Sequence, residues 1–235
     1  MKKLILSLSV LAMVACTGNG GKTEGDGNDS LNVEQQQNGA QAEEVPTDLL
    51  TVDLCGPVKY MVLTTRDCGR NGEPSSEPYQ FDRFQFDEEG NMVKGFYWSE
   101  EGTEFPELVR NEQGQIESVL TYIADFDTNR EDNYYYGEDG KVVSIEINGI
   151  ESYSSKALLY TDGKLTGFTE DSASEGTVYK TNGEYKVLDV DDYGNWTKRI
   201  VKYTQEMGPD DGSDEMEEGS EEWYELQERE IEYYE

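Results

Sequence analysis

Histidine is absent from this chain of 235 residues, and cysteine occurs only three times. Without histidine the chain cannot form a Ser-His-Asp triad, a Cys-His nucleophile pair or a His-ligated metal site. Three cysteines are too few for a zinc site built from four thiolates. The sequence also lacks a Gly-rich phosphate loop, a nucleotide-binding fingerprint and a Gly-x-Ser-x-Gly elbow. Catalysis that depends on histidine, on a zinc-thiolate centre or on a bound nucleotide is therefore excluded or disfavoured.

Positive charge is scarce as well. The chain has 19 Lys and Arg against 51 Asp and Glu, which gives a formal net charge of −32. Proteins that bind nucleic acids neutralise phosphates with Lys and Arg, so we expect no nucleic-acid partner. The same charge disfavours direct electrostatic docking on anionic lipid.

No apolar run is long enough to span a bilayer, which needs about 20 residues. The one apolar run, Leu4 to Ala15, follows Lys2 and Lys3 and ends immediately before Cys16. This pattern resembles a bacterial lipoprotein signal, in which residues 1–15 are removed and Cys16 is lipidated with acyl chains such as palmitate. The alternative is an ordinary secretory signal peptide with an incidental cysteine.

The resemblance implies a membrane partner through the lipid anchor and a place in the cell envelope. Thr17, and not an aspartate, follows the cysteine, and the next residues contain no compact acidic cluster. This resembles sorting to the outer membrane, facing the periplasm, with surface exposure as the alternative. Residues 16–47 are polar and acidic with few apolar residues, so we expect a disordered tether. The remaining residues, 48–235, have the length of a single domain.

A repeated turn motif dominates this domain. An acidic residue, Asn or Gly precedes a glycine by one to three positions, and apolar alternation resumes after it, around glycines 90, 114, 140, 163, 183 and 194. Asp or Asn before Gly favours tight hairpin turns with positive φ. The pattern predicts an all-β fold, an antiparallel hairpin-repeat meander that forms either a twisted sheet or an open sandwich, with no amphipathic helix.

The motif is similar to the YD repeat of RHS-like proteins, most closely at Asp192-Tyr193-Gly194-Asn195-Trp196. Together with the opening Leu54-Cys55-Gly56-Pro57-Val58-Lys59, it resembles uncharacterised lipoproteins of the Bacteroidetes type. The resemblance covers roughly residues 54–205 and implies the repeat fold. It implies no activity.

Local patterns give three finer predictions. The parity change between Tyr79–Phe81 and Phe84–Phe86 predicts a bulge at Asp82-Arg83. The basic segment 195–205 and the acidic segment 221–235 are expected to pair as antiparallel strands with opposite charges facing each other. The alternative for residues 215–230 is a charged helix.

Cys55 and Cys68 are 13 positions apart in an exported chain, so we expect a disulfide between them. Two buried thiols, or strands that hold the cysteines too far apart, are the alternatives. Oxygen ligands alternate at Asp125, Asp127, Asn129 and Glu131, as in a calcium loop, but the required glycine and final glutamate are missing. We therefore expect no cofactor, with calcium as the alternative.

Aromatic residues are the stronger candidates for binding. Neighbouring residues on a strand point to opposite faces, so an aromatic pair or triplet places at least one ring outward unless both faces are covered. The candidates are Tyr97, Trp98, Tyr135, Trp196 and Trp223. The alternative is that these rings fill a core.

The sequence thus predicts a lipid-anchored cell-envelope protein without catalytic residues. We expect a monomer that serves as a binding or scaffold module for a glycan or for another envelope protein. The alternative function is a polysaccharide hydrolase that uses two carboxylates, a mechanism that needs no histidine.

Overall fold

The computed structural model describes residues 47–97, 106–123, 126–209 and 220–235, with the backbone alone at 47 and 94–97. Within these ranges the chain forms one short helix and twelve strands. The elements are α1 (Thr47–Thr51), β1 (Val58–Asp67), β2 (Gln80–Phe86), β3 (Met92–Tyr97), β4 (Glu107–Arg110), β5 (Ile116–Ile123), β6 (Thr128–Tyr136), β7 (Val142–Gly149), β8 (Ser152–Thr161), β9 (Lys164–Ser174), β10 (Thr177–Val190), β11 (Trp196–Pro209) and β12 (Glu221–Tyr233).

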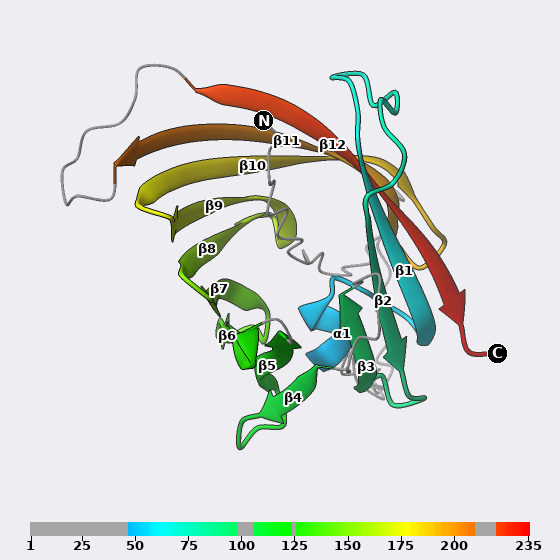
Figure 1. The fold of residues 1–235 in the computed structure, drawn as a ribbon. Helices are drawn as coiled ribbons and strands as arrows, with labels where there is room; N and C mark the ends of the chain where they lie inside the picture. Colours follow the sequence, from blue (N-terminus) through cyan, green and yellow to red (C-terminus); the bar gives the residue numbers. More distant parts are fainter. Residues whose placement is uncertain (1–46, 98–105, 124–125, 210–219) are drawn as a thin grey trace, which may run out of the picture.

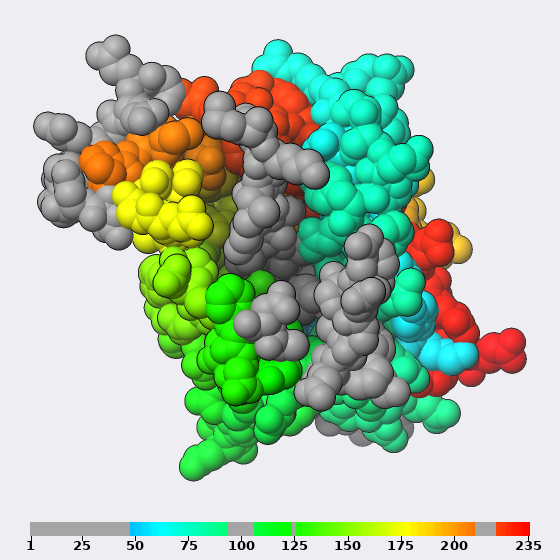
Figure 2. Space-filling view, in the orientation of Figure 1, coloured from blue at the N-terminus to red at the C-terminus, as the bar shows by residue number. Residues whose placement is uncertain are grey.

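All twelve strands belong to a single antiparallel sheet in the order β3-β2-β1-β12-β11-β10-β9-β8-β7-β6-β5-β4. The sheet bends into an arch with α1 inside it, between the two ends of the strand order (Figure 1). Figure 2 shows β4–β9, in green to yellow, and the cyan to teal strands β1 and β2 on opposite sides of the arch. The antiparallel meander is confirmed. It forms one open sheet and not a sandwich, because all twelve strands are hydrogen-bonded in a single linear order, with β1 and β12 paired inside it.

The predicted glycine turns lie side by side at one end of the strands, which we call the turn end. Four of them share one hydrogen-bond pattern, in which a glycine N–H donates to the carbonyl three residues earlier, at Gly90, Gly114, Gly140 and Gly194. Each of these glycines has a positive φ, between 76° and 86°. Asp162 and Gly163 form a two-residue turn with positive φ at both positions.

Gly183 is the exception to this pattern, because it lies in the middle of β10 and not in a turn. A Cβ atom at this position would lie 2.0 Å from Cε1 of Phe168 on the neighbouring strand. The glycine is therefore required for close packing between β9 and β10, and the turn predicted there is wrong.

The last two strands pair as predicted. Lys198 lies opposite Glu228 in the β11–β12 register, and their Nζ and Oε1 atoms are 2.8 Å apart. The helix considered for residues 215–230 is wrong over its described part, which belongs to β12. The bulge predicted at Asp82-Arg83 is also wrong, because β2 keeps regular register with β1 through both residues.

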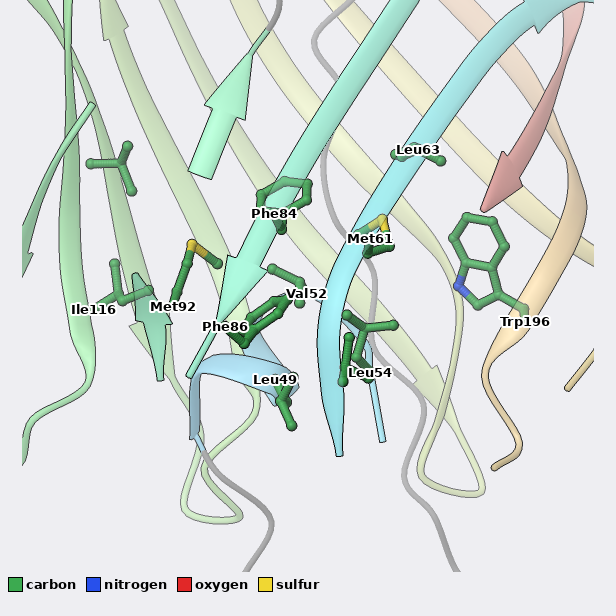
Figure 3. Packing of buried hydrophobic residues seen from close by; sticks show 12 residues of the cluster. Leu49, Val52, Leu54, Met61, Leu63, Phe84, Phe86, Met92, Ile116 and Trp196 are labelled. Atoms are coloured by element: carbon green, nitrogen blue, oxygen red, sulfur yellow. The ribbon is translucent and has the colours of Figure 1, made fainter. Parts of the chain in front are cut away.

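The hydrophobic core lies on the inner face of the arch, toward the turn end. Leu49, Val52 and Leu54, from α1 and the residues after it, pack against Met61, Phe84 and Phe86 in one cluster (Figure 3). A second cluster joins Val142, Ile145, Leu158 and Phe168 from β7 to β9. The short helix, which the sequence analysis did not predict, therefore fills the turn end of the arch.

The carboxylate of Asp48 connects the two ends of the strand order. It accepts a hydrogen bond of 2.6 Å from the backbone N–H of Met92 on β3. It also receives both terminal nitrogens of Arg110 on β4, at 2.7 and 3.0 Å. Because Asp48 is only 2% exposed, this bidentate pair is shielded from solvent and holds the edges together.

The opening segment and the YD-like turn also contact each other. The side-chain amide of Asn195 accepts from Cys55 N at 2.7 Å and donates to Cys55 O at 2.9 Å. A Cβ atom on Gly56 would lie 2.5 Å from the ring of Tyr193, so this position requires glycine. None of the helices in the described ranges is long and apolar enough to cross a membrane.

Candidate functional site

The inner face of the arch changes from apolar to polar along its strands. On β8 the inward positions run from Leu158, near the turn end, to Lys156 and Ser154, and all three are buried. On β1 they run from Met61 and Leu63 to Thr65. Buried polar side chains are far more informative about function than exposed apolar ones. The end of the inner face away from the turns is therefore the candidate site.

The same change recurs on β2, β6, β9, β10 and β12, whereas β7 keeps apolar Ile147 at this level. We call eight inward-facing residues on five adjacent strands the inner polar cluster. These are Ser154, Lys156, Glu170, Thr181, Tyr203, Gln205, Trp223 and Glu225.

Glu225 and two stacked rings form the aromatic part of this cluster. Tyr203 and Trp223 lie opposite each other on β11 and β12, with parallel rings and centroids 4.8 Å apart. The hydroxyl of Tyr203 donates to Oε2 of Glu225 at 2.8 Å. Glu225 is 3% exposed, whereas both rings are half-buried, so the two rings stand face to face beside a buried carboxyl group.

The opposite wall of the cluster is an ion pair. Nζ of Lys156 lies 2.9 Å from Oε2 of Glu170, its neighbour on β9. The other oxygen of Glu170 accepts from the hydroxyl of Ser154 at 2.5 Å. Lys156 also lies 4.2 Å from the centroid of the Phe168 ring, which adds a cation–π contact. Its charge is therefore neutralised within the protein.

A second carboxylate faces Glu225 from β1. Asp67 is the register partner of Glu225, and it follows Leu63 and Thr65 on the inward side of its strand. Directly opposed residues of an antiparallel pair have Cβ atoms about 5 Å apart, and like charges there destabilise the pair. Among the described residues, no Lys or Arg forms an ion pair with either carboxylate.

Burial sets the protonation behaviour of the cluster. It raises the pKa of Glu225, and the hydroxyls of Tyr203 and Tyr79 oppose this shift by donating to the carboxylate. Burial also lowers the pKa of Lys156, while Glu170 raises it. Each shift weakens the charged form of its group in the unliganded protein.

Beneath the cluster, toward the turn end, aromatic rings and guanidinium groups alternate. Arg199 lies between the rings of Tyr185 and Trp196, 3.9 Å from each centroid, and Arg229 covers the other side of Trp196 at 3.6 Å. The indole N–H of Trp196 donates to Asp53 at 2.6 Å. We call these five residues the arginine stack. It forms a rigid floor below the polar cluster.

The outer face has a hollow of about 250 Å³ lined by Arg70, Lys186, Ile200, Lys202 and Tyr224, among others. Glu222 accepts ion pairs from both Arg70 and Lys202 there, at 3.4 and 3.1 Å. The charges of Arg70 and Lys202 are therefore neutralised within the protein, so this hollow is the weaker candidate.

The structure separates the five predicted binding aromatics. Trp223 is in the inner polar cluster, whereas Trp196 is 1% exposed and belongs to the arginine stack and the core. Tyr135 faces outward, 45% exposed, and donates to Glu146. Tyr97 lies on β3 with its side chain outside the description, and Trp98 lies outside the described residues.

The predicted disulfide between Cys55 and Cys68 does not form, because Cys68 is a free, buried thiol. Cys55 precedes β1 and Cys68 follows it, so the ten residues of the strand separate them. Ten extended residues span about 33 Å, whereas a disulfide requires Cα atoms within about 7 Å. The alternative of cysteines held too far apart is correct.

The predicted calcium ligands do not converge in the described part of the chain, where no group of three or more His, Cys, Asp or Glu could hold a metal ion. Asp127 instead accepts from the hydroxyl of Tyr122 at 2.8 Å, and Asn129 and Glu131 follow it on β6. Asp125 and the lipidation candidate Cys16 lie outside the described residues.

Most of the inner polar cluster, including Lys156, Glu170, Tyr203 and Glu225, was not predicted from the sequence. Their signal was present as charged residues at the alternate positions that an apolar-inward pattern assigns to the core. Comparison with known proteins adds no functional assignment: no protein-family model matches the chain, and no curated protein matches it in sequence.

Proposed function

We propose that this chain is a lipid-anchored cell-envelope protein that binds a glycan on the inner polar cluster. One observation carries the proposal. The parallel rings of Tyr203 and Trp223 lie beside buried groups that donate and accept hydrogen bonds. Sugars present apolar ring faces and many hydroxyls, so aromatic rings flanked by fixed polar groups are complementary to them.

The envelope location rests on the sequence. The apolar run before Cys16 favours export and lipidation, and the glycine turns support the likeness to YD-repeat lipoproteins. The tether proposed for residues 16–47 would let the sheet reach ligands at a distance from the membrane. Binding without catalysis agrees with the lack of histidine.

A thermal unfolding scan tests the proposal. The chain from residue 17 onward, which retains every described residue, is heated with a panel of bacterial and host polysaccharides, and also with calcium or a chelator. A ligand that binds only the folded state at 100 times its Kd stabilises it by about 2.7 kcal/mol. We expect one polysaccharide to raise the melting temperature, and calcium to have no effect.

Matched aromatic variants show whether the inner face is responsible. Trp223→Leu should abolish the shift, whereas Tyr135→Leu, on the outer face, should leave it intact. If no polysaccharide shifts the wild-type transition, or if both variants respond equally, the proposed site is wrong.

A second candidate function is polysaccharide hydrolysis, which the pairing of Glu225 with Asp67 favours. One carboxyl group is buried with a raised pKa and the other is exposed, as an acid and a nucleophile require. Retaining glycosidases use two carboxyl groups on neighbouring positions, about 5 Å apart, and register partners on adjacent strands can reach such a separation. An assay for new reducing ends on each bound polysaccharide tests it, and Glu225→Gln must abolish any activity found.

A further inference from the structure

We infer that the glycan bound by the inner polar cluster carries protonated amino groups. Glu225 and Asp67 receive the ammonium group, beside the stacked rings of Tyr203 and Trp223. This inference rests on the proposed function and specifies its ligand class.

The opposed carboxylates are the first support. Glu225 and Asp67 are register partners on neighbouring strands, and no Lys or Arg among the described residues forms an ion pair with either. The nearby Lys156 forms its ion pair with Glu170 at 2.9 Å, and its charge only partly offsets the burial that raises the pKa of Glu225. A ligand ammonium group placed between the two carboxylates would remove their repulsion, so the free protein is prepared for a cation.

The aromatic rings are the second support. Ring faces attract ammonium groups, and the combination of carboxylate and rings favours amines over neutral sugars. Trp223 and Glu225 occupy alternate positions of β12 and therefore share the inner face, while Tyr203 bonds to Glu225. Because Glu225 is 3% exposed, its attraction to a cation is weakly screened by solvent.

The whole-molecule charge is the third support. A net charge of −32 attracts cations and repels polyanions over distances comparable to the Debye length. The field therefore brings amine-bearing ligands toward the protein and disfavours acidic polysaccharides.

Calorimetric titration of the chain from residue 17 onward, with two matched oligosaccharides, tests the inference. A β-1,4-linked glucosamine oligomer and its fully N-acetylated form have the same rings and differ in the ammonium groups. We expect the glucosamine oligomer to bind at least about tenfold more tightly, a difference of about 1.4 kcal/mol. Equal affinities would overturn the inference and leave the proposed glycan function standing.

Two charge-matched variants assign the preference to the site. Glu225→Gln keeps an oxygen for the hydroxyl of Tyr203, so we expect it to fold and to lose the tenfold preference. Glu230→Gln makes the same change of charge at an exposed position of β12 and should keep the preference. An equal loss in both variants would show that only the net charge matters, which overturns the site.

Spermidine and calcium chloride complete the test. Binding of neither oligomer would overturn the inference, while the polysaccharide panel decides the glycan proposal separately. Spermidine binding as tight as that of the glucosamine oligomer would show that the sugar contributes nothing, which also overturns the glycan proposal. Competition by millimolar calcium for Glu225 would indicate a metal site in place of an ammonium site.

Discussion

At the scale of single residues, the notable feature is how many charges lie inside the arch. Arg199 and Arg229 are 2% and 5% exposed, yet within the described ranges Asp53 is the one carboxylate that forms an ion pair with either, at 3.8 Å from Arg229. Aromatic rings stabilise much of the remaining charge by stacking. Burying ions costs free energy unless they are paired, so the arginine stack contributes more to the fixed placement of its side chains than to the stability of the fold.

Asp53 should make stability depend on pH. Burial raises its pKa from the ordinary 3.8 to about 7, although Arg229 and Arg199 oppose the shift. Because this pKa is raised in the folded state, the protonated carboxyl group of Asp53 contributes to the free energy of unfolding. This contribution is fully present below pH 3.8 and is lost as the pH rises to about 7. Urea unfolding of wild type and Asp53→Asn should show a smaller pH slope for the variant in this window. Identical slopes would contradict this.

Thr65 should be replaceable at a gain in stability. Its side chain is 1% exposed, and its hydroxyl has no hydrogen-bond partner among the described residues. Thr65→Val keeps the shape and removes the unsatisfied group, so the free energy of unfolding should rise by about 1 kcal/mol. Chemical denaturation measures this, with the exposed Thr166 changed to Val as control. A loss of stability would show that the hydroxyl is satisfied.

At the scale of elements, the sheet depends on close approaches between strands as well as on turns. β9 and β10 come so near each other that a Cβ on Gly167 would lie 2.2 Å from the carbonyl oxygen of Gly183. Gly183 leaves room for the ring of Phe168, and Gly167 leaves room for the backbone of β10.

Gly183→Ala should therefore destabilise the fold by about 1–3 kcal/mol, the usual cost of overpacking. The cause is the predicted clash with the ring of Phe168. A double-mutant cycle with Phe168→Ala checks this by denaturation, because the alanine should cost less once the ring is gone. An unchanged cost would place the strain in the backbone instead.

The sequence predicted most of the turns correctly, but it predicted a turn at Gly183 and a bulge at Asp82 that the structure lacks. Turns were readable because Gly90, Gly114, Gly140 and Gly194 meet a local backbone requirement that a short motif reveals. Gly183 was misread because its requirement comes from another strand. A bulge was predicted at Asp82 because inward positions of a strand are usually apolar. Asp82 is in fact a polar residue that is buried on the inner face, so the strand needs no bulge there.

The site was least predictable for the same reason. Lys156 and Glu225 look like solvent-facing residues on strands, and only the bending of the sheet turns their face inward. The pairing of Lys198 with Glu228, by contrast, could be predicted from the sequence. Two segments of opposite charge indicate an antiparallel strand pair without any knowledge of how the sheet bends.

At the scale of the whole molecule, charge and topology act together. The whole chain has a net charge of −32, and its described residues form a single sheet with acidic residues in its turns. Repulsion between the negative charges destabilises such a compact state. The pairing of β1 with β12 opposes it by joining the first strand of the sheet to the last.

Salt should therefore stabilise the protein. Raising sodium chloride from about 0.02 M to about 0.5 M shortens the Debye length from roughly 20 Å to below 5 Å, which screens the repulsion. The melting temperature should rise over this range, because the surface ion pairs that salt weakens are worth little each. A falling melting temperature would mean that the ion pairs on β11 and β12 outweigh the repulsion.

The central pairing of β1 and β12 also decides how the protein would respond to a mechanical load. Val58 and Tyr233 are register partners, and Tyr234 N donates to Pro57 O beside them, so both ends of the folded part leave the sheet at one place. A pull on the two ends would open this seam like a zipper, one hydrogen bond after another, and would not shear all of them at once.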